Sequence, residues 1–151
     1  MSEMKAIFFD LDDTLVNIKE AEHDASIEFK KLFKEFDSIE DEEFASLWRK
    51  LACEQYERYT RKEISYERNK INRIIELFSM VGIKKEDEEA KEIFNTYLYF
   101  YEKNWKAYSD VNETLDKLKK NYMISFTVIS GATRGLPPWR SFWTSARIIP
   151  M

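Results

Sequence analysis

The sequence predicts an α/β fold in which a small parallel sheet is interrupted by a large all-helical segment, so that most residues are helical. Two short runs rich in apolar, β-branched and aromatic residues, at 4–9 and 122–130, predict two parallel strands. Between these runs, apolar residues recur at spacings of three and four, which is the period of a helix.

The strands differ from the rest of the chain in their pattern. Residues 4–9, MKAIFF, form a continuous apolar run rather than an alternating one. A continuous run is expected where both faces of a parallel sheet are covered. Residues 122–130, YMISFTVIS, combine β-branched and aromatic side chains and predict the second strand.

Four apolar stripes predict the helices of the middle block. They span residues 25–36, 44–59, 71–81 and 90–105. Gly82 follows the third stripe, at a position where a helix C-terminus favours glycine. The acidic runs at 40–43 and 86–89 are expected to lie in the first turns of helices, where negative charge is favoured.

A further helix is expected in the segment SDVNETLDKLKKNY, which precedes the second strand. Asp110 suits the N-cap position, and Glu113, three residues later, is placed to complete a capping box. Its apolar face consists of Val111, Leu115, Leu118 and Tyr122.

Composition excludes several classes of protein. The net charge of −4 gives no basic footprint for nucleic acid. No apolar stretch approaches the roughly 20 residues of a membrane-spanning helix, and the N-terminus has no signal-peptide pattern. The single cysteine, Cys53, excludes an intrachain disulfide. We therefore expect a cytoplasmic protein with no nucleic-acid or membrane partner.

The segment 131–151 has an unusual composition. It holds all three prolines, and its charged residues are three arginines with no Asp, Glu or Lys. This change of composition predicts an atypical C-terminal tail. It is explained either by a different reading frame from about residue 130 or by an ordinary irregular arm.

Three aspartates follow the first strand in the stretch FFDLDDTLV. In open α/β sheets, ligands bind at the carboxyl ends of the strands. Three acids at that edge repel one another unless a cation shares the site, and Mg²⁺ prefers such oxygen ligands. With Asp10 and Asp12 two residues apart, one carboxylate can attack a phosphorus atom while the other handles the leaving-group proton.

The stretch DLDDTL resembles the first motif, DxDxT, of the haloacid dehalogenase-like (HAD) hydrolase superfamily. The resemblance implies that Asp10 is the nucleophile, and that Asp12 is the general acid/base. Both residues would hold Mg²⁺, Asp12 through its backbone carbonyl. The amides of Leu11 and Asp12 would bind phosphate oxygens, and Thr14 would shape the loop. The dehalogenase branch of the family lacks the second aspartate, so Asp12 favours phosphoryl transfer.

The resemblance also implies the domain organisation of subfamily I, in which a helical cap follows the first motif. A partial, Rossmann-like HAD core would comprise residues 1–16 and 106–130, with the cap at 17–105 and the atypical tail at 131–151. Basic residues of the stretch RYTRKEISYER could bind a substrate's remote end, or pair with neighbouring acids on a solvated face.

Two of the four family motifs find a match in this chain. Ser130, at the end of the second strand, is the candidate for the second motif and for phosphate binding, with Thr127 as a weaker candidate. No lysine follows Lys120 and no acid follows Asp116, so the third and fourth motifs have no match. The expectation is a truncated or frameshifted HAD core that covers its open sheet edges as a homo-oligomer or a segment-exchanged dimer.

Two functions follow from these residues. The first is a Mg²⁺-dependent phosphatase that acts on a small phosphorylated metabolite through an aspartyl-phosphate intermediate, impaired in this chain. The alternative is a non-catalytic HAD relic that acts by oligomerisation or weak ligand binding. A phosphoaspartate receiver fits poorly, because that fold has no place for a large helical insertion after the acid cluster. The residues are compatible with an enzyme and with a non-catalytic protein.

Overall fold

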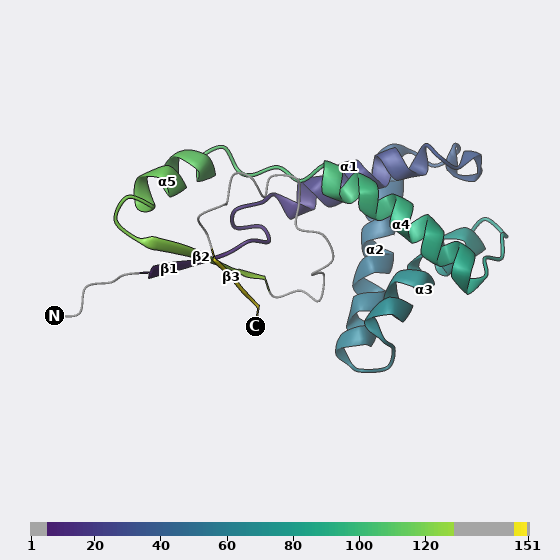
Figure 1. The fold of residues 1–151 in the computed structure, drawn as a ribbon. Helices are drawn as coiled ribbons and strands as arrows, with labels where there is room; N and C mark the ends of the chain where they lie inside the picture. The colour runs from purple at the N-terminus through teal and green to yellow at the C-terminus, as the bar shows by residue number, and fades with distance from the viewer. Residues whose placement is uncertain (1–5, 129–146, 151) are drawn as a thin grey trace. The chain divides into compact units, whose positions relative to one another are not determined.

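The computed structural model describes residues 6–128 and 147–150. The chain divides into two compact units (Figure 1). The first, here called the sheet unit, comprises Met1–Lys19 and Trp105–Met151, and the second, the helical unit, comprises Glu20–Asn104. Most of the described residues are helical, as the sequence predicts.

The sheet unit contains three parallel strands in the order β1-β2-β3 (Figure 1). The two predicted strands form β1 (Ala6–Asp10) and β2 (Met123–Val128), and they pair in parallel as expected. The third strand, β3 (Arg147–Pro150), comes from the segment that the sequence marks only as an atypical tail. Its apolar part is only two isoleucines long, too short to predict a strand.

One helix of the sheet unit, α5 (Val111–Leu118), precedes β2 and packs on the sheet. The core between them consists of the buried residues Leu15, Val111, Leu115, Ile124 and Phe126. The capping-box prediction was wrong, because Asp110 stands at the N-cap position without a side-chain capping bond. Glu113 pairs instead with Lys117, four residues later on the exposed side of the helix.

The helical unit contains four helices (Figure 1). They are α1 (Ile18–Lys30), which begins in the sheet unit, α2 (Asp41–Thr60), α3 (Tyr66–Ser79) and α4 (Asp87–Lys103). The acidic runs lie at the starts of α2 and α4, as predicted. Gly82 follows α3 with a φ of 76°, a left-handed conformation that glycine adopts without strain.

The first predicted stripe is not one continuous helix. Its α-helix ends at Lys30, and a separate 3₁₀ turn, Lys34–Phe36, carries Phe36 into the core. Phe33, between the two segments, contacts Phe29 of the α-helix and Phe36 of the 3₁₀ turn, at ring-centroid distances of 5.1 and 6.3 Å. The two segments therefore contribute rings to one aromatic cluster. Apolar spacing alone does not distinguish this bend from a straight helix.

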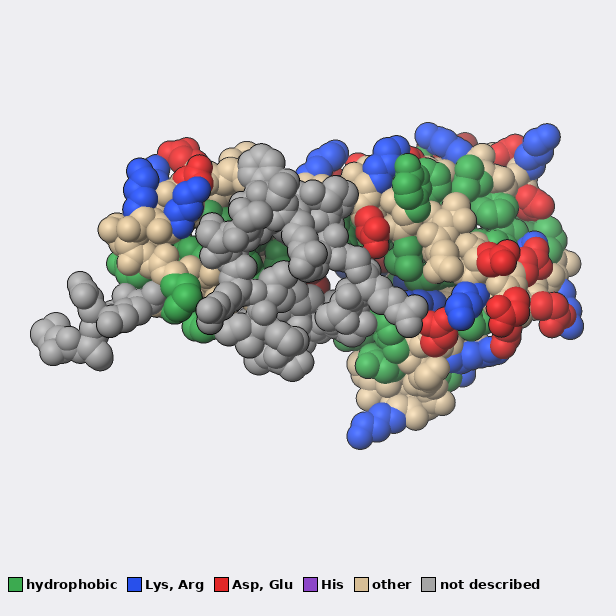
Figure 2. All heavy atoms as spheres, in the orientation of Figure 1, with side chains coloured by type: hydrophobic (Ala, Val, Ile, Leu, Met, Phe, Trp, Pro, Cys, Tyr) green, Lys and Arg blue, Asp and Glu red, His purple; other side chains and the backbone are tan. Residues whose placement is uncertain are grey.

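Charged side chains of both signs are interspersed on the visible face of the helical unit (Figure 2). In the stretch 58–68, Arg58 and Arg61 both pair with Glu63, at 3.7 and 3.1 Å, and Arg68 pairs with Asp87. These pairs match the solvated-face interpretation of that stretch. Among the described residues, no helix is long and apolar enough to cross a membrane.

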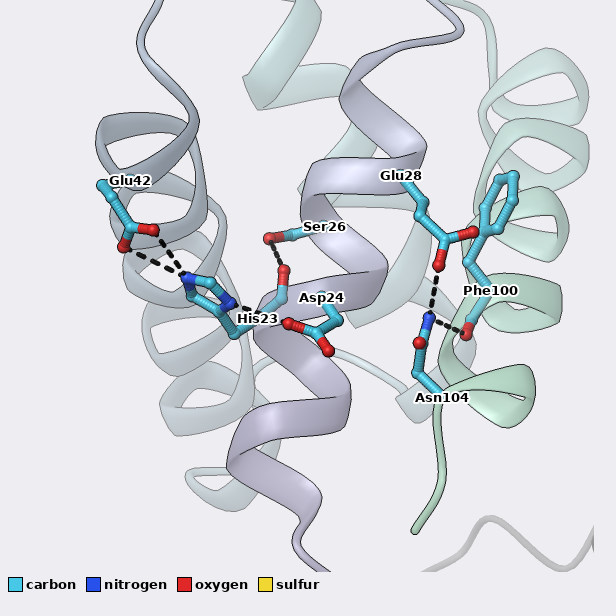
Figure 3. Close-up of polar contacts among 7 residues, drawn as sticks. All are labelled: His23, Asp24, Ser26, Glu28, Glu42, Phe100 and Asn104. Carbon is cyan, nitrogen blue, oxygen red and sulfur yellow. Dashed lines mark hydrogen bonds and ion pairs between the residues drawn. The ribbon is translucent and has the colours of Figure 1, made fainter.

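His23, the single histidine, links α1 to α2 (Figure 3). Its Nδ1 lies 3.1 Å from an Asp24 carboxylate oxygen, and its Nε2 lies 3.1 and 3.2 Å from the two oxygens of Glu42. Hydrogen bonds to Asp24 and then to Glu42 raise the pKa of His23 above its ordinary value. The charged imidazolium is therefore favoured in the folded state.

A raised folded-state pKa stabilises the protein at low pH, and this stabilisation is lost as the pH rises through that pKa. We therefore expect His23→Gln to lower the free energy of unfolding by about 0.5 kcal/mol at about pH 5.5 and hardly at all at about pH 9. The expected loss is small because the contacts of His23 with Asp24 and Glu42 are partly exposed to solvent. Urea unfolding at both pH values measures this difference. An equal loss at the two pH values would contradict the assigned role of the charge.

Candidate active site

The predicted catalytic aspartates lie where β1 ends, in a tight loop of residues 10–16, here called the acidic loop. The backbone carbonyl of Leu11 accepts hydrogen bonds from the amides of Thr14, Leu15 and Val16, at 3.3, 3.0 and 3.0 Å. This triple acceptor folds the chain back on itself directly after the strand. These hydrogen bonds hold the loop backbone in one conformation, and the positions of its Cβ atoms are fixed with it.

The C-terminal end of the acidic loop is packed and hydrogen-bonded to the rest of the sheet unit. Leu15 and Val16 are buried, and Leu15 belongs to the core under α5. The carbonyl of Leu15 accepts from the amide of Tyr108 at 3.1 Å, and Val16 forms a bridge with Ala107. Burial of the apolar half holds the acidic half of the loop at the surface.

Asp10 and Asp12 are both exposed, as reactive groups must be to meet a substrate. The Asp10 carboxylate accepts a hydrogen bond from the backbone amide of Leu11 at 2.9 Å. The pKa of Asp12 is raised, first by partial burial of its carboxyl and then by the negative charges of Asp10 and Asp13. Asp12 therefore holds a proton more readily than an ordinary aspartate.

Asp13 has a structural role that the sequence did not reveal. Its backbone is in the left-handed region, with a φ of 54°, which is uncommon for a residue other than glycine. Its carboxylate accepts from the amide of Lys19 at 3.2 Å and lies 3.5 Å from the Lys19 ammonium. These contacts join the acidic loop to the first turn of α1. No motif spacing signals them, because they depend on the loop's fold.

The predicted phosphate-binding residues are placed only in part. Thr14 is exposed in the acidic loop, and the amide of Leu11 points at the Asp10 carboxylate. The strand register puts Thr127, at backbone level, opposite Asp10. Ser130 lies outside the described residues. The pairing of β1 with β2 therefore places Asp10, of the first motif, beside the end of β2, where the second motif is expected.

The oxygen atoms at the end of β1 suit a hard cation such as Mg²⁺. No group of three or more metal-ligating side chains converges among residues 6–128 and 147–150. Mg²⁺ is commonly held by one or two carboxylates, with water and substrate phosphate completing its shell. Asp10 and Asp12 meet that smaller requirement. After burial, the negative charges of Asp10 and Asp13 raise the pKa of Asp12, and a cation would relieve that repulsion.

Comparison with protein families identifies the chain. The model of the haloacid dehalogenase-like hydrolases matches residues 4–140, which is most of the sequence. The chain belongs to the haloacid dehalogenase-like hydrolase family. The family predicted from DLDDTL is thereby confirmed, and the architecture fits an α/β HAD core with a helical cap.

Solved structures support the same fold. The chain is similar to the HAD-hydrolase YfnB from Bacillus subtilis, crystallised with magnesium, at a TM-score of 0.68 and 13% identity. It is also similar to the 2-haloacid dehalogenase from Pseudomonas syringae pv. Tomato DC3000, at a TM-score of 0.53 and 16% identity.

These alignments cover 84% and 97% of this chain but only 53% and 64% of the two structures, so the chain spans about half to under two thirds of their lengths. A search of curated proteins gave no match. At identities of 13% and 16%, the similarity shows only the fold of this HAD protein. Its reaction has to be inferred from the residues of the site.

Proposed function

We propose that this HAD protein is a Mg²⁺-dependent phosphatase that acts on a small phosphorylated metabolite. The observation that carries the proposal is the second acid, Asp12, two residues after Asp10 and with a raised pKa. A general acid must hold a proton near the working pH, and partial burial beside like charges favours that state. A dehalogenase has no leaving-group oxygen to protonate and needs no such acid.

The reaction divides between the two carboxyl groups. An oxygen of Asp10 attacks the phosphorus atom, the bond to the leaving oxygen breaks, and Asp12 gives its proton to that oxygen. Asp12, now ionised, then takes a proton from water, which attacks the aspartyl phosphate and releases phosphate. Asp10 is thereby restored as a carboxylate and Asp12 as an acid.

Other residues of the acidic loop prepare this step. The amide of Leu11, which now donates to Asp10 at 2.9 Å, is available to a phosphate oxygen once Asp10 turns to attack. The amide of Asp12, Thr14 and Ser130 are proposed to complete the phosphate site. Asp10 and the backbone carbonyl of Asp12 would hold Mg²⁺, which supplies positive charge that offsets the repulsion between carboxylate and phosphate.

The alternative function is binding without turnover, in which the chain holds phosphate or Mg²⁺ weakly or assembles with copies of itself. One observation favours it: the sequence has no lysine after Lys120 and no acid after Asp116. Within residues 1–151, the remaining family motifs, a lysine and one or two acids, therefore have no match. Binding of phosphate with no release from any ester would support this alternative.

The decisive experiment offers two substrates to the same preparation. With p-nitrophenyl phosphate and Mg²⁺ we expect release of phosphate, and removal of Mg²⁺ with EDTA is expected to lower the rate about a hundredfold or more. With 2-chloropropionate we expect no release of chloride. Chloride release without phosphate release would assign dehalogenation instead, and release of neither would favour the non-catalytic alternative.

A further inference from the structure

Asp13 is the aspartate of the acidic loop to which the proposed reaction gives no part. Its side chain is 35% exposed and contacts the start of α1 through both carboxylate oxygens. One oxygen accepts a hydrogen bond from the Lys19 amide at 3.2 Å, and the other lies 3.5 Å from the Lys19 ammonium. A single side chain thus joins two points of the backbone that are six residues apart.

The backbone of Asp13 takes part in the same turn. Its φ of 54° lies in the left-handed region, and its amide donates to the carbonyl of Val16 at 2.9 Å. An aspartate keeps such a conformation where the surrounding contacts impose it. The bonds of Asp13 to Val16 and Lys19 are contacts of this kind, so its backbone and its side chain hold the turn together.

The Asp13 carboxylate serves as a distant cap of α1. The first amides of a helix have no partner within the helix, and an oxygen from outside usually accepts from one of them. Lys19 lies in the first turn of α1, and the oxygen that accepts from its amide comes from the acidic loop. Negative charge is also favoured at this end of a helix. The turn of the loop and the first turn of the helix are therefore linked.

Asp12 lies between two fixed parts of the loop backbone. Before it, the carbonyl of Leu11 accepts from three amides, and after it comes Asp13 with its bond to Lys19. No hydrogen bond from a described residue reaches the Asp12 carboxylate, so its direction follows from the backbone on either side. Displacing a catalytic group by about 1 Å can cost about a hundredfold in rate. The Asp13 side chain is therefore placed to affect catalysis through Asp12.

We propose that Asp13 is a positioning residue, whose side-chain oxygen holds the Lys19 amide and thereby fixes the turn that presents Asp12 to the leaving-group oxygen. The inference rests on the proposed phosphatase reaction, in which Asp12 protonates that oxygen. In this role Asp13 contacts no reacting atom and transfers no proton. It keeps the general acid within hydrogen-bond reach of the oxygen that it protonates.

Two substitutions separate this hydrogen bond from the charge and the backbone conformation of Asp13. Asp13→Gly and Asp13→Asn both remove the negative charge, and glycine and asparagine both enter the left-handed region readily. Asparagine alone of the two retains an oxygen that can accept from the Lys19 amide. Asp13→Asn is therefore the matched control, and the difference between the variants reports the hydrogen bond.

The kinetic test compares kcat/KM for p-nitrophenyl phosphate and phenyl phosphate with Mg²⁺. p-Nitrophenolate leaves readily without a proton, whereas phenolate depends on the general acid. In Asp13→Gly we expect kcat/KM to fall about tenfold or more for phenyl phosphate and about threefold or less for p-nitrophenyl phosphate. Asp13→Asn is expected to keep the wild-type ratio of the two values. A merely structural loss of folded protein lowers both values by the same factor.

Amide hydrogen exchange tests the turn without any turnover. The amides of Thr14, Leu15, Val16 and Lys19 are expected to exchange about tenfold faster in Asp13→Gly than in Asp13→Asn. If the wild type releases no phosphate from either ester but exchange differs in this way, the phosphatase proposal fails and the role of Asp13 in holding the turn stands.

Three results would overturn the inference. Equal exchange in the two variants would show that the bond to Lys19 does not hold the turn. An unchanged ratio of the two kcat/KM values in Asp13→Gly, with an active wild type, would show that Asp12 keeps its place without Asp13. The same change of ratio in Asp13→Asn as in Asp13→Gly would show that the hydrogen bond is not the cause.

Discussion

Replacing Asp10 with asparagine is expected to lower phosphate release from p-nitrophenyl phosphate by about a thousandfold or more, because the amide cannot form the aspartyl phosphate. Replacing Asp12 with asparagine removes the general acid and is expected to cost about a hundredfold to ten-thousandfold. Initial rates at saturating Mg²⁺ measure both effects. The double variant is expected to be no slower than Asp10→Asn alone, because the two residues act in one reaction.

The matched control is Asp116→Asn, the same chemical change at an exposed acid of α5 that pairs with Lys119. It is expected to leave the rate unchanged. A wild-type rate in Asp10→Asn would exclude a covalent intermediate on Asp10, whatever the rate of the control. Far-UV circular dichroism of each variant checks that the fold is intact, and none is expected to lose it because both aspartates are exposed.

The sequence predicted the parts of the fold that depend on local pattern. The continuous apolar run of β1 and the stripes of α2, α3 and α4 have strong periodicity, and each forms the element expected. The bend after Lys30 and the strand β3 depend on contacts made in the folded chain. Local spacing carries no record of such contacts, so neither was predicted.

The residues of the candidate site were likewise predicted only where a local motif signals them. Asp10 and Asp12 follow from a motif with fixed spacing. The contact of Asp13 with Lys19 depends on a left-handed turn that the sequence does not signal. Outside the site, the inward position of Arg73 on α3, with a side chain only 12% exposed, was also missed, because a charged residue near a helical stripe is ordinarily solvent-exposed. Its spacing of four residues from the buried Asn69 and Leu77 is the one signal that could have placed it on the inner face.

The largest effect on stability is expected from Phe29→Ala in the helical unit. Phe29 is fully buried, and its ring centroid lies 5.1 Å from Phe33, 5.4 Å from Trp48 and 5.8 Å from Tyr97. Truncation removes the ring from the centre of this aromatic cluster and leaves a cavity that the surrounding helices fill only in part. The expected loss is about 3–5 kcal/mol, a large share of the roughly 5–15 kcal/mol that stabilises a typical domain.

Urea unfolding followed by far-UV circular dichroism measures this loss, since the helices of the helical unit dominate that signal. The control is Tyr99→Ala on α4, an aromatic truncation at a side chain that is 65% exposed. It is expected to change the free energy of unfolding by about 0.5 kcal/mol or less. Because both variants lose an aromatic ring from the same unit, their difference isolates burial. Equal losses would mean that the cluster around Phe29 is not the core that holds the four helices together.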